Sequence, residues 1–251
     1  MAGDYAALAP YYNRIGLGDF ATQMTPRLLT YVQQNGWMGR RIVELGCGTG
    51  ACLIWLAGRG YSVIGVDNVP EILQHAQQAI DSASVSGSTV EADIRSLGDF
   101  ERTDMAIALG VMNDLDNLRE LEAVFKCVQA ILTKDRFFVF DMETIEGLTG
   151  RGLNEDRTLF EDKDLIVFSR TRYDFERQIC TVVYDLFDRA DAKHWNRVQA
   201  KQVLRGFPIQ AVASLLRRQN FEVLAVVNTS LQTLDLAVSG APKVVFVSKK
   251  T

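Results

Sequence analysis

Short apolar runs alternate with amphipathic stretches through the first 142 residues of the chain. Five apolar runs are too short for helices and predict buried strands, at residues 41–45, 62–67, 89–93, 104–109 and 137–141. Between them, residues 51–59, 70–82 and 118–132 place apolar side chains three or four positions apart, which predicts helices. Strands that alternate with helices are typical of a doubly wound parallel sheet covered on both faces. We therefore predict an α/β fold with a Rossmann-like sheet.

The alternation of strands and helices stops after residue 143. Residues 144–158 are polar and contain glycine, which predicts a loop. Strand-like runs without helices between them then predict an inserted antiparallel β meander, at residues 164–169, 171–175, 181–187 and 194–204. A helix at 209–219 and strands at 221–228 and 243–249 complete the larger sheet. That sheet is expected to have seven strands, of which the last one is antiparallel.

These patterns divide the chain into three parts. Residues 1–39 form an N-terminal helical segment, which could be a packed helix pair or a lid over a ligand. Residues 40–143 and 207–251 form the Rossmann-like domain. Residues 144–206 form the inserted region, which could be a substrate lid, the surface of a homodimer, or both.

Composition and charge narrow the range of partners. The chain has 27 Lys and Arg against 31 Asp and Glu, and its formal net charge of −4 argues against a nucleic-acid-binding surface. No apolar run approaches the roughly 20 residues that span a membrane, and the N-terminus lacks the pattern of a signal peptide. The four cysteines and two histidines have no metal-site spacing. We therefore expect a reduced cytoplasmic protein without a metal.

A glycine-rich turn follows the first predicted strand. Gly46, Gly48 and Gly50 allow a tight turn and a close approach of the backbone to a ligand. The loop also fits a relaxed dinucleotide-binding pattern, so by itself it leaves the ligand open. Glu44 precedes the loop by two residues and would repel a pyrophosphate but attract a cation. We interpret Cys47 as a small residue that fills the loop rather than as a nucleophile.

Acidic residues also end the second and third predicted strands. Asp67 is placed to accept both hydroxyls of a ribose, and Asp93 with Ile94 suits the amine and the face of an adenine. Because ligands of parallel sheets bind beyond the carboxyl ends of the strands, these residues are expected to share one cleft with Glu44.

With these residues in place, the chain resembles the class I S-adenosylmethionine-dependent methyltransferases. The matching segments, in family order, are residues 44–50, 66–68, 91–94, 104–113 and 138–141. The resemblance implies that S-adenosylmethionine is the cofactor. It also implies that the methionine part is surrounded by Glu44, Gly46, Cys47 and Gly48. Asp67 would hold the ribose, Asn68 and Val69 would flank adenine, and Asp93 and Ile94 would bind the adenine edge. The wall toward the methyl group would be formed by Leu109, Gly110 and Asn113.

The inserted meander and the N-terminal tyrosines resemble the subgroup that methylates small molecules, which includes glycine N-methyltransferase-like and amino-sugar N-methyltransferases. In that subgroup a tyrosine-containing stretch covers the cofactor, and here Tyr11 and Tyr12 would do so. The chain departs from many relatives at residues 113–115, where they carry an aromatic residue.

The resemblance implies in-line transfer of a methyl group to a nitrogen or oxygen of a small molecule. Alignment of the reactants supplies on the order of 7–11 kcal/mol, which exceeds the ~3–5 kcal/mol of one acid–base residue. No dedicated base is therefore required. The catalytic residues stay unassigned, and the candidates are Tyr11, Tyr12, Asn113 and His194. Two alternatives stay open: an NAD-dependent oxidoreductase, in which Glu44 would face a phosphate, and a non-catalytic S-adenosylmethionine-binding regulatory module.

Overall fold

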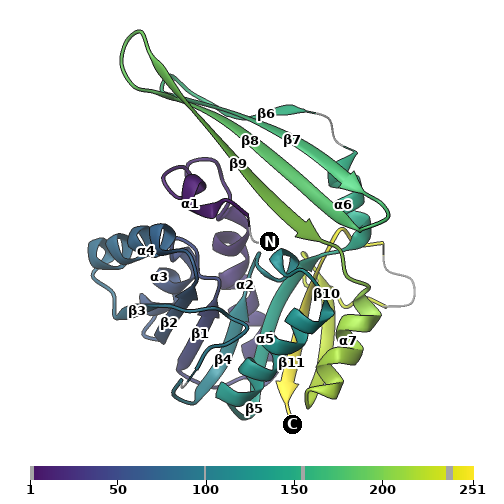
Figure 1. Cartoon of the computed structure of the whole chain (residues 1–251). Helices are drawn as coiled ribbons and strands as arrows, with labels where there is room; N and C mark the ends of the chain where they lie inside the picture. Colours follow the sequence, from purple (N-terminus) through teal and green to yellow (C-terminus); the bar gives the residue numbers. More distant parts are fainter. Residues whose placement is uncertain (1–2, 99, 154–155, 236–239) are drawn as a thin grey trace.

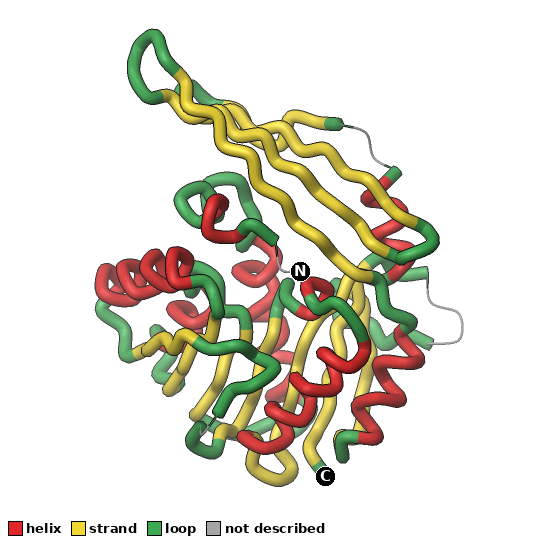
Figure 2. The backbone as a smooth tube through the Cα atoms, viewed as in Figure 1, coloured by secondary structure: helices red, strands yellow, loops and turns green. Residues whose placement is uncertain are grey.

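The computed structural model describes residues 3–98, 100–153, 156–235 and 240–251, which contain two β-sheets (Figures 1 and 2). The strands of the larger sheet are β1 (Arg41–Leu45), β2 (Ser62–Asp67), β3 (Gly87–Glu91), β4 (Thr103–Ala108), β5 (Leu132–Glu143), β10 (Phe221–Asn228) and β11 (Lys243–Lys250). Their spatial order is β10-β11-β5-β4-β1-β2-β3. Strand β11 runs antiparallel to both its neighbours, and the other strand pairs of this sheet are parallel. The predicted seven-stranded α/β fold is confirmed.

Two apolar clusters cover the two faces of the larger sheet. Because successive strand residues point to opposite faces, β5 contributes Phe138 and Phe140 to one cluster and Phe137 and Val139 to the other. Helices α5 (Leu118–Ile131) and α7 (Ile209–Arg218) complete the first cluster, and α2 (Asp19–Gln34) and α3 (Ala51–Ala57) complete the second. Helix α4 (Pro70–Ala83) packs beside β3. Among the described helices, none is long and apolar enough to cross a membrane.

The smaller sheet is an antiparallel meander between β5 and α7 in the sequence. Its strands are β6 (Arg157–Glu161), β7 (Leu165–Asp174), β8 (Ile179–Arg189) and β9 (Trp195–Arg205), paired in that order. The sequence predicted two strands where the structure has the single strand β7, and it missed β6. In β7 the buried Leu165 and Val167 alternate with more exposed residues, so the strand buries one face only.

The prediction that residues 144–158 form a loop is wrong, because Ile145–Gly152 form helix α6. The hydroxyl of Thr144 caps this helix by accepting a hydrogen bond from the N–H of Gly147 (3.0 Å). A Cβ atom on Gly147 would lie 1.9 Å from the carbonyl oxygen of Pro242. The glycine that suggested a loop is therefore a close packing contact between this helix and the approach to β11.

The N-terminal segment, residues 4–18, lies between the two sheets (Figure 1). It contains the short helix α1 (Tyr5–Leu8), and its Leu8 and Ile15 are buried against the inner face of the smaller sheet. The backbone N–H of Asp4 donates to the carbonyl of Lys201 in β9 (2.7 Å), and the N–H of Lys201 donates to the Asp4 carboxylate (2.9 Å). The segment is thus fixed to the edge strand of the smaller sheet.

Candidate active site

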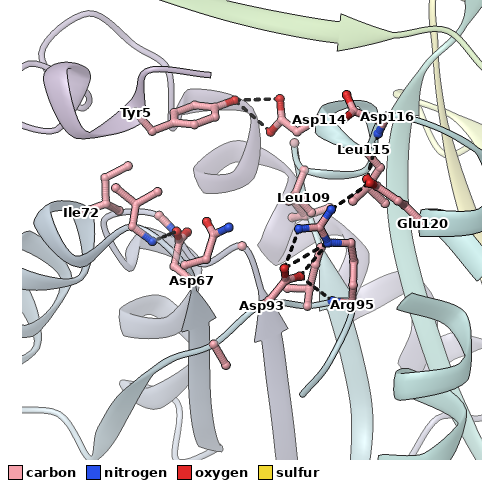
Figure 3. A pocket seen from close by; sticks show the side chains of 18 of the residues that line it. Tyr5, Asp67, Ile72, Asp93, Arg95, Leu109, Asp114, Leu115, Asp116 and Glu120 are labelled. Carbon is pink, nitrogen blue, oxygen red and sulfur yellow. Dashed lines mark hydrogen bonds and ion pairs between the residues drawn. The ribbon is translucent and has the colours of Figure 1, made fainter. Parts of the chain in front are cut away.

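Two adjoining pockets lie at the carboxyl ends of β1, β2 and β4. Pocket A extends toward β3 and is lined by residues that include Asp67, Asp93 and Asp114 (Figure 3). Pocket B extends toward β5 and β11, and its lining includes Glu44 and Lys243. The two pockets share Tyr5, Tyr12, Gly46, Gly48, Leu109 and Gly110. They therefore form one continuous cleft.

The glycine loop between β1 and α3 has the conformation that only glycine adopts readily. Gly46, Gly48 and Gly50 have φ angles of +66°, +54° and +81°. A Cβ on Gly46 would lie 2.7 Å from the side chain of Val111. The thiol of Cys47 is buried, which raises its pKa well above the usual range. Cys47 therefore fills space in the loop, and its thiol has no nucleophilic character near neutral pH.

Glu44 is a buried acid at the carboxyl end of β1. This residue is 3% exposed and lines pocket B, and its Oε2 atom has no hydrogen-bond partner among the residues that the structure describes. Burial raises the pKa of this carboxyl to about 8. A buried, unpaired carboxylate is costly unless a cation or a proton neutralises it. The site is therefore complementary to a cationic group.

Asp67 joins the end of β2 to the glycine loop. Its carboxylate accepts hydrogen bonds from the backbone N–H of Gly48 (3.0 Å) and of Val69 (3.1 Å). Burial raises the pKa of Asp67, although these backbone N–H groups favour the charged form. Asn68 and Val69 follow it along the wall of pocket A.

Asp93 lines pocket A, but its carboxylate is already paired. Both oxygens accept hydrogen bonds from the guanidinium of Arg95, and Arg95 also pairs with Glu120 at 2.8 Å (Figure 3). The Arg95 hydrogen bonds hold the pKa of Asp93 below its usual value. Strand β3 ends at Glu91, so Asp93 lies in the following loop, while the adjacent Ile94 is buried at the pocket wall.

The two tyrosines expected over the cofactor face different ways. Tyr12 lines both pockets, whereas Tyr11 lines neither, and its hydroxyl lies 3.3 Å from the carboxylate of Asp188 in β8. Tyr5 lines both pockets instead. Tyr5 lies in α1, whereas Tyr12 lies in the turns that follow this short helix.

Asp114 is a site residue that the sequence did not identify. It lies in the single helical turn η1 (Met112–Asp114) and accepts hydrogen bonds from the Tyr5 hydroxyl on both carboxylate oxygens (3.0 and 2.9 Å; Figure 3). Burial raises its pKa to about 7. The Tyr5 hydroxyl in turn accepts a hydrogen bond from Gln202 of β9 (2.8 Å).

Known proteins with related sequences are methyltransferases. Residues 42–135 match the family model described as a methyltransferase domain. The chain is 24% identical over 186 residues to YqeM of Bacillus subtilis (strain 168), which is named as a candidate methyltransferase; the match covers 73% of this chain and 74% of YqeM. It is 26% identical to the ubiquinone biosynthesis O-methyltransferase of Actinobacillus pleuropneumoniae serotype 7 (strain AP76), and this match covers 47% of the chain and about half (52%) of that relative.

Solved structures share the whole fold. An S-adenosylmethionine-dependent methyltransferase from Clostridium acetobutylicum superposes with a TM-score of 0.84 at 18% identity, and the match covers 98% of both chains. The sugar N-methyltransferase KedS8 from Streptoalloteichus gives a TM-score of 0.75 at 18% identity, covering 95% of this chain and 92% of KedS8. Residues 42–135 thus match a methyltransferase domain, and the chain has the fold of S-adenosylmethionine-dependent methyltransferases. The glycine loop and the Glu44 Oε2 atom, which lacks a hydrogen-bond partner among the described residues, are consistent with S-adenosylmethionine, a cationic ligand.

Asn113 joins the two sheets of the methyltransferase. Its amide donates to the carbonyls of Glu143 (3.0 Å) and Arg205 (2.8 Å) and accepts the N–H of Glu143 (2.8 Å). Although Asn113 lines pocket B, its amide is occupied by the ends of β5 and β9. We therefore interpret it as a positioning residue rather than a catalytic one.

Replacement of Asn113 with alanine is expected to lower the free energy of unfolding by about 2–4 kcal/mol, because three buried hydrogen bonds are lost and backbone groups stay unpaired. Urea denaturation measures the change. Asn117→Ala is the matched control: Asn117 caps α5 at an exposed position, and its loss should cost only about 1 kcal/mol. Equal effects of the two substitutions would contradict the role of Asn113.

His194 lies outside the site of the methyltransferase. It is in the turn between β8 and β9, its side chain is 73% exposed, and its ring pairs with Asp191 at 2.8 Å. The long strands β8 and β9 carry this turn away from the larger sheet (Figure 1). We therefore exclude His194 from the catalytic candidates.

Charged residues of pocket B also form ion pairs between separate elements. Glu143 at the end of β5 pairs with Arg151 of α6 at 2.8 Å. Lys243 at the start of β11 pairs with Asp141 at 2.8 Å. Both pairs bring together residues that approach the cleft from different elements, so only the folded chain reveals them.

Proposed function

We propose that this methyltransferase transfers the methyl group of S-adenosylmethionine to a nitrogen or an oxygen of a small-molecule acceptor. The enclosure of pocket B is the observation that supports a small acceptor. Beyond the glycine loop, this pocket is bounded by the N-terminal segment, by Arg151 of α6, and by Gln202 and Leu204 of β9. A macromolecular acceptor would have to displace these elements.

The cofactor is proposed to lie across both pockets. Asp67 binds the ribose hydroxyls, and adenine is contacted by Asn68, Val69 and Ile94. Asp93 does not bind adenine directly, because its carboxylate is paired with Arg95. We further propose that residues 40–143 and 207–251 bind the cofactor, and that residues 1–39 and 144–206 enclose the acceptor. The wall toward the acceptor is then formed by Leu109, Gly110 and Asn113.

The chain contributes mainly alignment and exclusion of water. When bound, S-adenosylmethionine supplies an electrophilic methyl group on a sulfonium. Tyr5 and Tyr12 cover the cleft, and such enclosure holds reactants in line. Asp114 lines pocket A, where burial raises its pKa to about 7, and Glu143 lines pocket B as an ion pair with Arg151.

A transfer screen tests the proposal. The protein is incubated with methyl-labelled S-adenosylmethionine and, separately, with panels of small amines, alcohols and carboxylates and with total RNA. Label is expected in a small amine or alcohol, with equal formation of S-adenosylhomocysteine. Transfer to RNA alone would contradict a small acceptor, and the identity of the labelled product decides between nitrogen and oxygen.

A further inference from the structure

The start of helix α2 lines pocket B. Gly18, Phe20 and Ala21 contribute to the pocket wall, and the N-cap residue Gly18 has no side chain to cap the helix. The N–H of Thr22 donates to the carbonyl of Gly18 (3.1 Å), whereas the N–H groups of Phe20 and Ala21 have no backbone acceptor within the described part of the chain. Free N–H groups and the helix dipole make this end of α2 favourable for an anion.

Lys243 brings a positive charge to the same wall. Its side chain is 21% exposed and lines pocket B, and its Nζ atom lies 4.0 Å from the centre of the Phe20 ring. An ammonium has three N–H donors. One donates to the Asp141 carboxylate at 2.8 Å, so two remain for a ligand. The ammonium is thus held between the end of β5 and the first turn of α2.

Pocket B therefore contains an acid with one unpaired oxygen and a base with two N–H donors beyond its pair with Asp141. Glu44 Oε2 has no hydrogen-bond partner among the described residues, and Glu44 is only 3% exposed. An α-amino acid group, with one ammonium and one carboxylate, is complementary to this combination. S-Adenosylmethionine carries such a group at its methionine end, whereas a neutral ligand would leave the Glu44 Oε2 atom without a charged partner.

We propose that Lys243 and the first turn of α2 bind the α-carboxylate of the methionine part of S-adenosylmethionine, while Glu44 receives the α-ammonium. The inference rests on the proposed placement of the cofactor across both pockets. It makes Lys243 a determinant of cofactor specificity: the protein distinguishes S-adenosylmethionine from analogues that lack the carboxylate.

Calorimetric titration of Lys243→Met with S-adenosylmethionine and with decarboxylated S-adenosylmethionine tests the proposal. The second ligand keeps the sulfonium and the ammonium but lacks the carboxylate. The substitution should weaken binding of S-adenosylmethionine by about tenfold or more, because a charged hydrogen bond is lost. Binding of the decarboxylated ligand should stay within about twofold, since it makes no such bond. Lys249→Met, on the same strand but paired with Glu222, is the matched control and should bind both ligands normally.

Equal weakening for the two ligands would overturn the proposal, because it would indicate that Lys243 only supports the fold around Asp141. No weakening for either ligand would overturn it as well. If Lys243→Met does not fold, the double variant Asp141→Asn with Lys243→Met removes the unpaired buried carboxylate and allows the same comparison. Failure of the unmodified protein to bind either ligand would instead contradict the placement of the cofactor on which the inference rests.

Discussion

Replacement of Asp67 with alanine is expected to weaken S-adenosylmethionine binding by about 10- to 100-fold. The Asp67 carboxylate accepts the N–H groups of Gly48 and Val69 and is the proposed partner of the ribose hydroxyls. Hydrogen bonds to a charged group contribute roughly 1.5–3 kcal/mol each, and about 1.4 kcal/mol corresponds to tenfold in affinity. Isothermal titration of the folded variant measures the loss.

Asp93→Ala is the matched comparison for Asp67→Ala, because both remove an acid from the wall of pocket A. The Asp93 carboxylate is already occupied by Arg95 at a partly exposed position, where ion pairs contribute only about 0–1 kcal/mol. Its loss should therefore change the affinity by less than about fivefold. Unchanged affinity in a folded Asp67→Ala variant would remove Asp67 from the cofactor site, and equal losses would contradict the distinction between the two acids.

The second large effect concerns pH. The affinity for S-adenosylmethionine is expected to rise as the pH increases from about 6 to 8, and Glu44→Gln should remove most of this rise. Glu44 has a pKa of about 8 without a ligand, and the α-ammonium requires the ionised carboxylate. Below pH 8, binding must therefore release a proton, which costs up to about tenfold in affinity per pH unit.

Two comparisons isolate the contribution of Glu44. The pKa of Asp114 is about 7, so Asp114→Asn measures the share of that second acid. The neutral ligand 5′-methylthioadenosine lacks the amino acid group. Its affinity should therefore have no pH dependence that Glu44→Gln removes. A pH dependence of S-adenosylmethionine binding that is identical in Glu44→Gln and the unmodified protein would contradict the role of Glu44.

The same group affects the stability of the ligand-free protein. The pKa of Glu44 is raised from a usual value of 4.5 to about 8 on folding, so between these values the unfolded state is ionised while the folded state keeps its proton. The free energy of unfolding should therefore fall as the pH rises from about 5 to 8 and level off above it. Urea denaturation at pH 5, 6.5 and 8 should show a smaller fall for Glu44→Gln.

Local sequence patterns predicted which acids lie at the strand ends that border the cleft. Glu44 and Asp67 follow short apolar strands, and the carboxyl ends of parallel strands meet at one edge of the sheet. The glycines at 46, 48 and 50 require backbone angles that few other residues adopt. These features depend on neighbours in the sequence, so the sequence alone predicts them.

Residues whose roles depend on long-range packing were placed wrongly or missed. Tyr11 was preferred to Tyr5 because the sequence does not show which ring faces the cleft and which faces β8. Helix α6 was predicted as a loop because its segment is polar and contains glycine. Gly147 is instead a close contact with Pro242, which is 95 positions away in the sequence and so leaves no local signal. His194 was a candidate catalytic residue because of its imidazole, but it lies in the turn between the long strands β8 and β9, away from the cleft.

The sequence by itself determined the larger sheet, the glycine loop and the acids at the ends of β1 and β2, because hydrophobic period and backbone freedom are local properties. Only the tertiary structure decided which charges meet in the cleft. Asp93 is occupied by Arg95, Tyr5 donates to Asp114, and Lys243 pairs with Asp141 across 102 positions of the sequence. Such pairs form where separate elements converge. The fold therefore decides which charged side chains are already paired and which can still bind a ligand.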